Sequence, residues 1–357
     1  MKKSNARSAR GRLPPLVLLS LIVAALVGEV FLRVFYPCPR YNYAYQPPQQ
    51  TFFRYDSLLG WKGRPGADGT FASLDFIVRV THDRHGHRSS TDPTLPGKRN
   101  VIVVGDSYGW GWGVDNDDVF AEVMMRETGW NVYNLSAPGY GTDQQLLEID
   151  LLTRRPTPGP EADVGVLLFT KNDFLDITSE ERYGYPKPRF LFDGAEPLLS
   201  NVPVPERETS VYDSARSLER YKRTWFNNSH LYNFVIEVCR KVLRTLGIGP
   251  PAAVDPDRAV EAEDVRAAAQ LIQMMRDEFA ERGTDFYVIL MMPDNDRCWD
   301  DLESKLARMG IAASRFNDRV FYRQTRLWLD RHLNAFGHRR LAAAVTATVR
   351  KSFADES

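Results

Sequence analysis

The chain has 357 residues, of which 43% are hydrophobic and 26% are charged. This composition is typical of a globular protein and excludes a wholly disordered chain. The 46 basic and 46 acidic residues cancel, so the charge gives no indication of a polyanionic partner such as nucleic acid. The length is ample for one large domain with attachments.

Charge is unevenly placed at the N-terminus. Residues 1–12 include five basic residues and no acidic one, and an apolar segment follows over 13–36. A helix of that length measures about 36 Å and exceeds a hydrocarbon core of about 30 Å. Glu29 and Arg33 stand one helical turn apart near its end, where they can pair. We therefore predict a membrane-spanning helix.

The segment 13–36 has two interpretations, an uncleaved anchor and a cleavable signal peptide. The anchor is favoured because the segment is longer than a usual signal-peptide core and no A-x-A-like site follows. The preceding basic residues predict a cytoplasmic N-terminus and an extracytoplasmic chain after residue 36. There, Cys239 and Cys298 can bridge, although unpaired thiols fit equally well, and Cys38 lies at the membrane exit.

Residues 37–98 are predicted to be an attachment to the main domain. Prolines among tyrosines and glutamines over 37–51 favour an extended spacer. Over 52–90, short apolar stretches alternate with Gly and Pro, which predicts a small β extension.

From residue 99 the pattern changes to strands that alternate with helices. The expected strands are 101–104, 131–135, 164–169 and 285–292, and the expected helices lie near 117–128, 143–152, 261–282 and 334–353. Such alternation predicts βαβ units and a mainly parallel sheet with helices on both faces, a three-layer α/β/α fold over 99–353.

An interruption over about 174–258 separates the third and fourth of these strands. It includes a predicted hairpin with Asp193-Gly194 at its turn and two helical stretches near 211–222 and 229–246. Because it follows a strand end, we expect it to form a cap over the carboxyl edge of the sheet.

Ser107 is a candidate nucleophile because Gly105-Asp106-Ser107 directly follows a strand expected to be buried. A serine hydroxyl needs a base, and the base needs an orienting group. The histidines of the segment 82–87 are read as part of a solvated loop rather than metal ligands, and no metal or cofactor is predicted. His338 is read as a packing residue, and His230 has no evident partner.

Asp330 and His332 offer the missing pair, since an Asp two residues before a His in a loop can orient the imidazole. Oxyanion donors are expected from the loops after two further strands. Gly139 and Gly141 lie in a glycine loop after strand 131–135, and Asn172 follows strand 164–169.

Together, Gly-Asp-Ser, the glycine loop, Asn-Asp after the third strand and the C-terminal Asp and His resemble the SGNH/GDSL hydrolases, in the order that this family shows. The resemblance implies a flavodoxin-like sheet, Ser107 as nucleophile, His332 as base and Asp330 as its orienter. It also implies an oxyanion hole formed by the Ser107 N–H, the Gly139 N–H and Asn172.

The sequence departs from the family pattern at two positions. Thr170 stands where the family usually has Gly, and Asp330-x-His332 replaces the commoner Asp-x-x-His. The second departure concerns the role of Asp330, and Gly139 is preferred over Gly141 as the backbone donor.

The rival G-x-S-x-G reading of 105–109, an α/β-hydrolase elbow, is disfavoured because Ser107 follows the first core strand. The function predicted is an extracytoplasmic, membrane-anchored serine esterase acting on acyl esters such as acetyl esters. The alternatives are an O-acyltransferase that modifies cell-envelope glycans and an inactive glycan-binding module. Trp110, Trp112 and Tyr140 are candidates for stacking on a polysaccharide, with core packing expected for at least one tryptophan. The sequence makes no prediction of oligomeric state.

Overall fold

The structure is a computed structural model that describes residues 15–36, 52–73, 76–89, 98–153, 162–192, 196–206, 229–246, 258–317, 323–327 and 330–354. The chain divides into two compact units. One comprises residues 1–45 and 212–248, and the other comprises residues 46–211 and 249–357.

The larger unit is built on a five-stranded parallel sheet in the order β13-β12-β7-β5-β6. Its strands are β5 (Asn100–Val104), β6 (Asn131–Asn134), β7 (Val164–Phe169), β12 (Asp285–Met291) and β13 (Ala312–Phe316). From β6 to β13 this is the flavodoxin-like order 2-1-3-4-5, as expected. The order of strands reverses between β5 and β7, which is where such sheets place a ligand.

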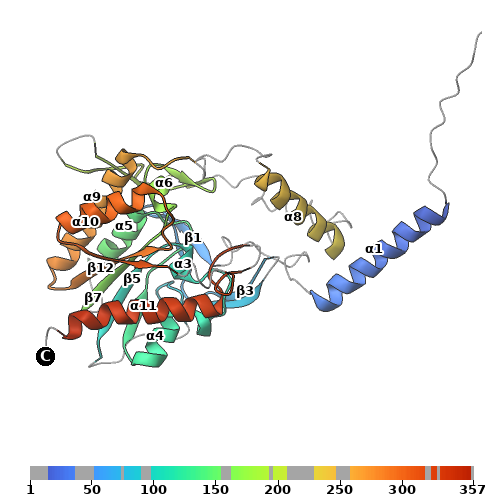
Figure 1. Ribbon diagram of the computed structural model, residues 1–357, viewed down its shortest axis with the longest axis horizontal. Coiled ribbons are helices and arrows are strands. Elements are labelled where there is room, and N and C mark those ends of the chain that lie inside the picture. Colours follow the sequence, from blue (N-terminus) through green and yellow to red (C-terminus); the bar gives the residue numbers. More distant parts are fainter. Residues whose placement is uncertain are drawn as a thin grey trace, which may run out of the picture. The chain divides into compact units, whose positions relative to one another are not determined.

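Helices cover both faces of the sheet (Figure 1). On one face lie α5 (Thr142–Thr153), α9 (Ala262–Ala280) and α10 (Arg297–Arg308), and on the other α4 (Phe120–Thr128) and α11 (Ala335–Ala354). Successive side chains of a strand point to opposite faces. Accordingly Ile102 and Val104 join the core under α9, whereas Val101 and Val103 join the core under α4 and α11. The predicted three-layer fold is confirmed.

α10 and β13 were not among the elements predicted from the sequence. β13 reads Ala-Ala-Ser-Arg-Phe, with only Phe316 buried. It is the edge strand beside β12, and an edge strand needs no long apolar run. In α10, Trp299, Leu302 and Leu306 are fully buried at helical spacing, so this pattern was present in the sequence.

Ahead of the sheet, two antiparallel hairpins form the small β extension. They are β1 (Phe53–Asp56) with β2 (Gly60–Gly63), and β3 (Asp68–Ala72) with β4 (Ile77–Thr81). Their apolar side chains share a core with Trp110, Tyr140 and Leu147 of the main domain.

The prediction of a solvated histidine loop is wrong for two of its three members. His82 is buried, and its Nε2 accepts a hydrogen bond from Trp110 Nε1 at 3.4 Å. His87 Nε2 lies 3.2 Å from Glu148 Oε1. Burial by itself would lower the pKa of His87, but the neighbouring carboxylates of Asp83 and Glu148 outweigh burial and raise that pKa. Only His85 is exposed. No group of metal-ligating side chains occurs among the described residues.

The segment after β7 begins with α6 (Asp173–Asp176) and continues as two short antiparallel hairpins. These are β8 (Glu181–Arg182) with β9 (Tyr185–Pro186), and β10 (Arg189–Leu191) with β11 (Leu198–Ser200). The second is the hairpin expected from the sequence. Its Asp193-Gly194 turn, the helix expected near 211–222, the spacer 37–51 and Cys38 lie outside the described residues.

The smaller unit has two helices, α1 (Pro15–Phe35) and α8 (His230–Thr245). By length and composition α1 is able to cross a membrane. The predicted pair is present, with Arg33 Nε 2.7 Å from Glu29 Oε1. Cys239 is exposed on α8, Cys298 is buried in the larger unit, and both are free thiols.

Candidate active site

Ser107 begins a single helical turn, α3 (Ser107–Trp110), directly after β5. Asp106 caps this turn, because its Oδ1 accepts a hydrogen bond of 2.9 Å from the Tyr108 N–H. Gly109 faces the neighbouring loop, where a Cβ would lie 2.2 Å from Ser136 Oγ. The Gly-Asp-Ser-x-Gly sequence is therefore what allows the strand to turn sharply and present the Ser107 hydroxyl.

Ser107, His332 and Asp330 form a continuous hydrogen-bonded chain. Ser107 Oγ lies 2.9 Å from His332 Nε2, and His332 Nδ1 contacts Asp330 Oδ1. Burial by itself would raise the pKa of Asp330, but hydrogen bonds from His332 and Trp112 hold that pKa below its ordinary value. An ionised carboxylate on Nδ1 leaves Nε2 as the nitrogen that faces the serine, the arrangement that a general base requires.

Two aromatic side chains from the Ser107 loop hold the imidazole. The ring of Tyr108 lies 4.7 Å and that of Trp112 5.6 Å from the His332 ring, centroid to centroid. Trp112 Nε1 also donates to Asp330 Oδ2 at 3.1 Å. Trp110 and Tyr140 are each 1% exposed. The idea that these two stack on sugar rings is therefore wrong, because both pack in the core.

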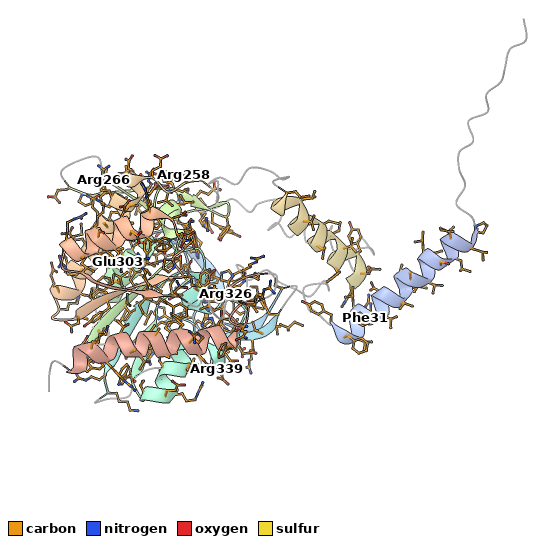
Figure 2. The ribbon with its side chains drawn as sticks, in the orientation of Figure 1. Phe31, Arg258, Arg266, Glu303, Arg326 and Arg339 are labelled. Atoms are coloured by element: carbon orange, nitrogen blue, oxygen red, sulfur yellow. The ribbon has the colours of Figure 1, made fainter. Side chains whose placement is uncertain are left out.

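The short Asp-x-His spacing depends on an unusual backbone conformation. Arg331, the intervening residue, has φ 73°, in the left-handed region that side chains other than glycine rarely adopt. The loop is held in this shape by Leu327, whose N–H donates to the His332 carbonyl at 2.9 Å, and by Arg326 (Figure 2), whose Nη1 donates to the Arg331 carbonyl at 3.3 Å. This tight turn places the Asp330 carboxylate against the imidazole of His332.

Gly139 and Gly141 differ in whether the backbone N–H is available. The Gly141 N–H donates to Gln144 Oε1 at 3.2 Å. Among the hydrogen bonds of the described residues, none uses the Gly139 N–H or the Ser107 N–H. Gly139 also has φ 77°, which suits glycine. These observations favour Gly139 over Gly141 as an oxyanion donor.

The Asn172 side chain is fixed at both ends. Its Oδ1 lies 2.8 Å from Thr170 Oγ1, and one Nδ2 proton goes to Asp176 Oδ2 at 2.9 Å. An amide nitrogen carries two protons, so the second remains for a substrate oxygen. Thr170 Oγ1 also lies 2.9 Å from Asp106 Oδ2, which ties the loop after β7 to the turn that presents Ser107. The departure from Gly at this position thus places a hydroxyl between the two loops.

Asp176 links Asn172 to the β8–β9 hairpin. Burial raises the pKa of Asp176 to about 6, although Arg182 and the Asn172 amide act in the opposite direction. Arg182 Nη1 lies 2.8 Å from Asp176 Oδ1, and its guanidinium lies 4.3 Å from the ring centre of Tyr183. Tyr183 is 69% exposed and approaches Gly139, where a Cβ would lie 3.1 Å from its Cε2. An exposed aromatic ring therefore borders the proposed oxyanion donors.

Lys187 holds the β8–β9 hairpin in place through the contacts of its buried ammonium group. Its side chain and that of Asp143 are fully buried and form an ion pair. The Lys187 ammonium also donates to the carbonyls of Asp176 (3.1 Å), Ser179 (3.1 Å) and Pro188 (2.8 Å). Burial raises the pKa of Asp143, and Lys187 offsets part of that rise.

We expect Lys187→Met to lower the free energy of unfolding by about 3–5 kcal/mol, because it leaves the Asp143 carboxylate buried without its counter-ion. Urea denaturation monitored by fluorescence measures the change. The matched control is Lys171→Met, since Lys171 is 48% exposed and pairs with the exposed Asp294 and Asp296. Loss of such a surface pair costs about 0–1 kcal/mol. Equal effects of the two substitutions would contradict a structural role for the buried pair.

No protein-family model and no curated protein matches the chain. Its fold is similar to that of several solved structures. A carbohydrate esterase with catalytic and non-catalytic binding functions is 10% identical over 84% of this chain and 85% of its own, with a TM-score of 0.39. An acetyl xylan esterase from Butyrivibrio proteoclasticus is 10% identical over 77% and 68%, with a TM-score of 0.38.

A G-D-S-L family lipolytic protein from Desulfitobacterium hafniense is 9% identical over 70% of this chain and 99% of its own, with a TM-score of 0.35. The flavodoxin-like sheet that the sequence motifs imply is the sheet observed, with the strand order β6-β5-β7-β12-β13.

The structure brings together the residues that the sequence singled out and adds others. Ser107, His332 and Asp330 are in contact, and the loops that carry Gly139 and Asn172 follow β6 and β7, the neighbours of β5. Sequence reasoning missed the contact of Trp112 with the acid. No sequence pattern links Trp112 to Asp330, which lies 218 positions further along the chain.

Proposed function

We propose that this chain is a serine esterase of the SGNH/GDSL type, anchored in a membrane by α1, with its larger unit outside the cytoplasm. The observation that carries the chemistry is the contact of Ser107 Oγ with His332 Nε2 at 2.9 Å, together with the contact of His332 Nδ1 with Asp330. The anchor is supported by the exposed apolar surface of α1 and by the basic residues ahead of it.

In the proposed mechanism, Ser107 Oγ attacks the ester carbonyl carbon while His332 Nε2 accepts the hydroxyl proton. The carbonyl oxygen becomes an oxyanion that receives hydrogen bonds from the N–H groups of Ser107 and Gly139 and from Asn172 Nδ2. When the tetrahedral intermediate collapses, the bond to the alcohol breaks and His332 gives the alcohol its proton. Water, deprotonated by the same nitrogen, then attacks the acyl carbon. The bond to Ser107 Oγ breaks, His332 returns the proton to that oxygen, and the acid is released.

Covalent labelling tests the proposal directly. The full chain in detergent, incubated with a fluorophosphonate probe, should be modified at Ser107, as located by peptide mass spectrometry. A p-nitrophenyl acetate assay of the same sample should show ester turnover that the probe abolishes. Turnover that persists in a sample fully labelled at Ser107, or absence of both labelling and turnover, would contradict the assignment.

We expect Asn172→Ala to lower kcat by about 10²–10³-fold, the usual cost of losing one oxyanion donor. KM should change little, because the donor acts mainly on the charge that develops in the transition state. Steady-state kinetics with a short acyl ester measure both constants, and the melting temperature of the variant checks its folding. A loss of less than tenfold in a folded variant would remove Asn172 from this role.

A further inference from the structure

The amphipathic helix α8 has an apolar face that the structure leaves open. At about 100° per residue, its apolar side chains occupy one broad arc. Six of them are more than a third exposed: Tyr232 43%, Val235 47%, Val238 37%, Val242 50%, Leu243 42% and Leu246 65%. The same helical period places positions 240, 241 and 244, which are Arg, Lys and Arg, on the opposite arc. A broad apolar arc opposite a basic one is typical of a helix that lies in a membrane interface.

The N-terminus of α8 is attached to α1, the helix proposed to span the membrane. Glu29 of α1 accepts hydrogen bonds from Ser229 Oγ (2.8 Å) and from the N–H groups of His230 (3.0 Å) and Leu231 (2.8 Å). These N–H groups have no partner within the helix, so the carboxylate caps α8. Gly28 lies beside this contact, where a Cβ would meet the Leu231 side chain at 3.4 Å, an ordinary van der Waals distance.

The position of Glu29 sets the depth at which α8 begins. Glu29 lies about 9 Å along the helix axis from Phe35, at a rise of about 1.5 Å per residue. An interfacial helix sinks its apolar face about 5–10 Å into the boundary between headgroups and acyl chains. The neighbouring apolar side chains of α1, such as Phe31 (Figure 2), are exposed as well. α1 and α8 therefore both expose apolar side chains at about the same depth along the α1 axis.

We propose that α8 is an interfacial membrane helix, with its apolar arc in the outer leaflet beside α1 and its basic arc facing anionic headgroups. The lipid bilayer is the occupant favoured over a protein partner because α8 is capped by a residue of the spanning helix itself. This inference rests on the proposed anchor. It also explains an acidic residue within an apolar span, since Glu29 has both Arg33 and the end of α8 as partners.

The native Cys239 provides a probe of the apolar arc. It is exposed on α8, whereas Cys298 is buried and burial raises the pKa of its thiol to about 11, so an environment-sensitive maleimide will label Cys239 in a Cys38→Ser chain. The matched control variant carries Cys239→Ser and Glu237→Cys, which moves the label to the polar arc. Both full chains are reconstituted in phosphatidylcholine vesicles with phosphatidylglycerol and doxyl-labelled lipid.

We expect the label at position 239 to be quenched by doxyl lipid at least about threefold more than the label at 237, with a blue-shifted emission. Val238→Asp with Val242→Asp should abolish this difference, while resistance to alkaline carbonate extraction shows that α1 remains inserted. Replacing the three basic residues of α8 by Gln should weaken the dependence on phosphatidylglycerol.

Equal quenching at the two positions in carbonate-resistant chains would overturn the proposal. So would a blue shift that depends on protein density rather than on lipid, because it would assign the apolar arc to a second copy of the chain. Loss of carbonate resistance in the parent chain would instead overturn the anchor. No substrate is involved, so failure of the proposed ester hydrolysis leaves this measurement unaffected.

Discussion

Replacing Ser107 by Ala should lower kcat for a short acyl ester by about 10⁶-fold, the loss seen when the nucleophile of such a triad is removed. The hydroxyl is the group that would form the covalent bond, and it lies 2.9 Å from His332 Nε2. Alanine retains the helical turn, because Asp106 caps that turn through its own carboxylate and the Tyr108 N–H. Steady-state turnover by the full chain in detergent measures the change.

Ser136→Ala is the matched control for Ser107→Ala. Its hydroxyl is buried beside the same turn, close to Gly109, and has no hydrogen-bond partner within the part of the chain that the structure describes. We expect this variant to retain turnover within about threefold, because no hydrogen bond is lost. Substantial activity in Ser107→Ala would assign the chemistry to another group. A comparable loss in both variants would indicate damage to the turn rather than loss of a nucleophile.

Asp330→Asn should lower kcat by about 10⁴-fold, the effect of an amide at this position of a serine triad. The Asp330 carboxylate accepts from His332 Nδ1 through Oδ1 and from Trp112 Nε1 through Oδ2. An amide has only one accepting oxygen and cannot serve both donors. If the amide nitrogen faces His332, the imidazole must turn its unprotonated nitrogen toward it and present a proton to Ser107, which disables the base.

The hydrogen bond from Trp112 to Asp330 provides a second, milder variant to compare with Asp330→Asn. Trp112→Phe preserves an aromatic ring beside His332 and removes only the donor to Oδ2, so the carboxylate still orients the imidazole. We expect a smaller loss, about 10–150-fold in kcat, because a hydrogen bond to a charged group is worth about 1.5–3 kcal/mol. Measurement of both variants across pH 5–9 separates loss of the base from a change in its ionisation. Near-wild-type activity of Asp330→Asn would exclude Asp330 as the orienting residue.

Much of the fold could be predicted because its physical causes are local in the sequence. The residues of β7, Val164–Phe169, form one apolar run, since a central parallel strand is buried on both faces. Ser107 and Asn172 were selected as candidates because ligands of open α/β sheets bind where the strands end. The edge strand β13 escaped prediction since one of its sides has no neighbouring strand to bury it.

Contacts between segments that lie far apart in the chain could not be predicted from the sequence. His82 was expected in solvent, yet Phe52 and Trp110 enclose it, their ring centres 5.9 Å and 6.1 Å from its own. The pattern around position 82 does not reveal those partners. The contact between Trp112 and Asp330 was hidden for the same reason, as was the left-handed conformation of Arg331 that makes the short Asp-x-His spacing workable.

Two short peptides account for every contact within the proposed triad. The segment 107–112 supplies the serine and the indole, and the segment 330–332 supplies the acid and the base; Ser107 touches His332 and Trp112 touches Asp330. Two contacts between the same pair of peptides fix both their separation and their relative rotation. A designer who wished to move this chemistry onto another parallel sheet would therefore have to transplant the two peptides together. The tryptophan would have to accompany the serine, although it takes no part in any bond that is made or broken.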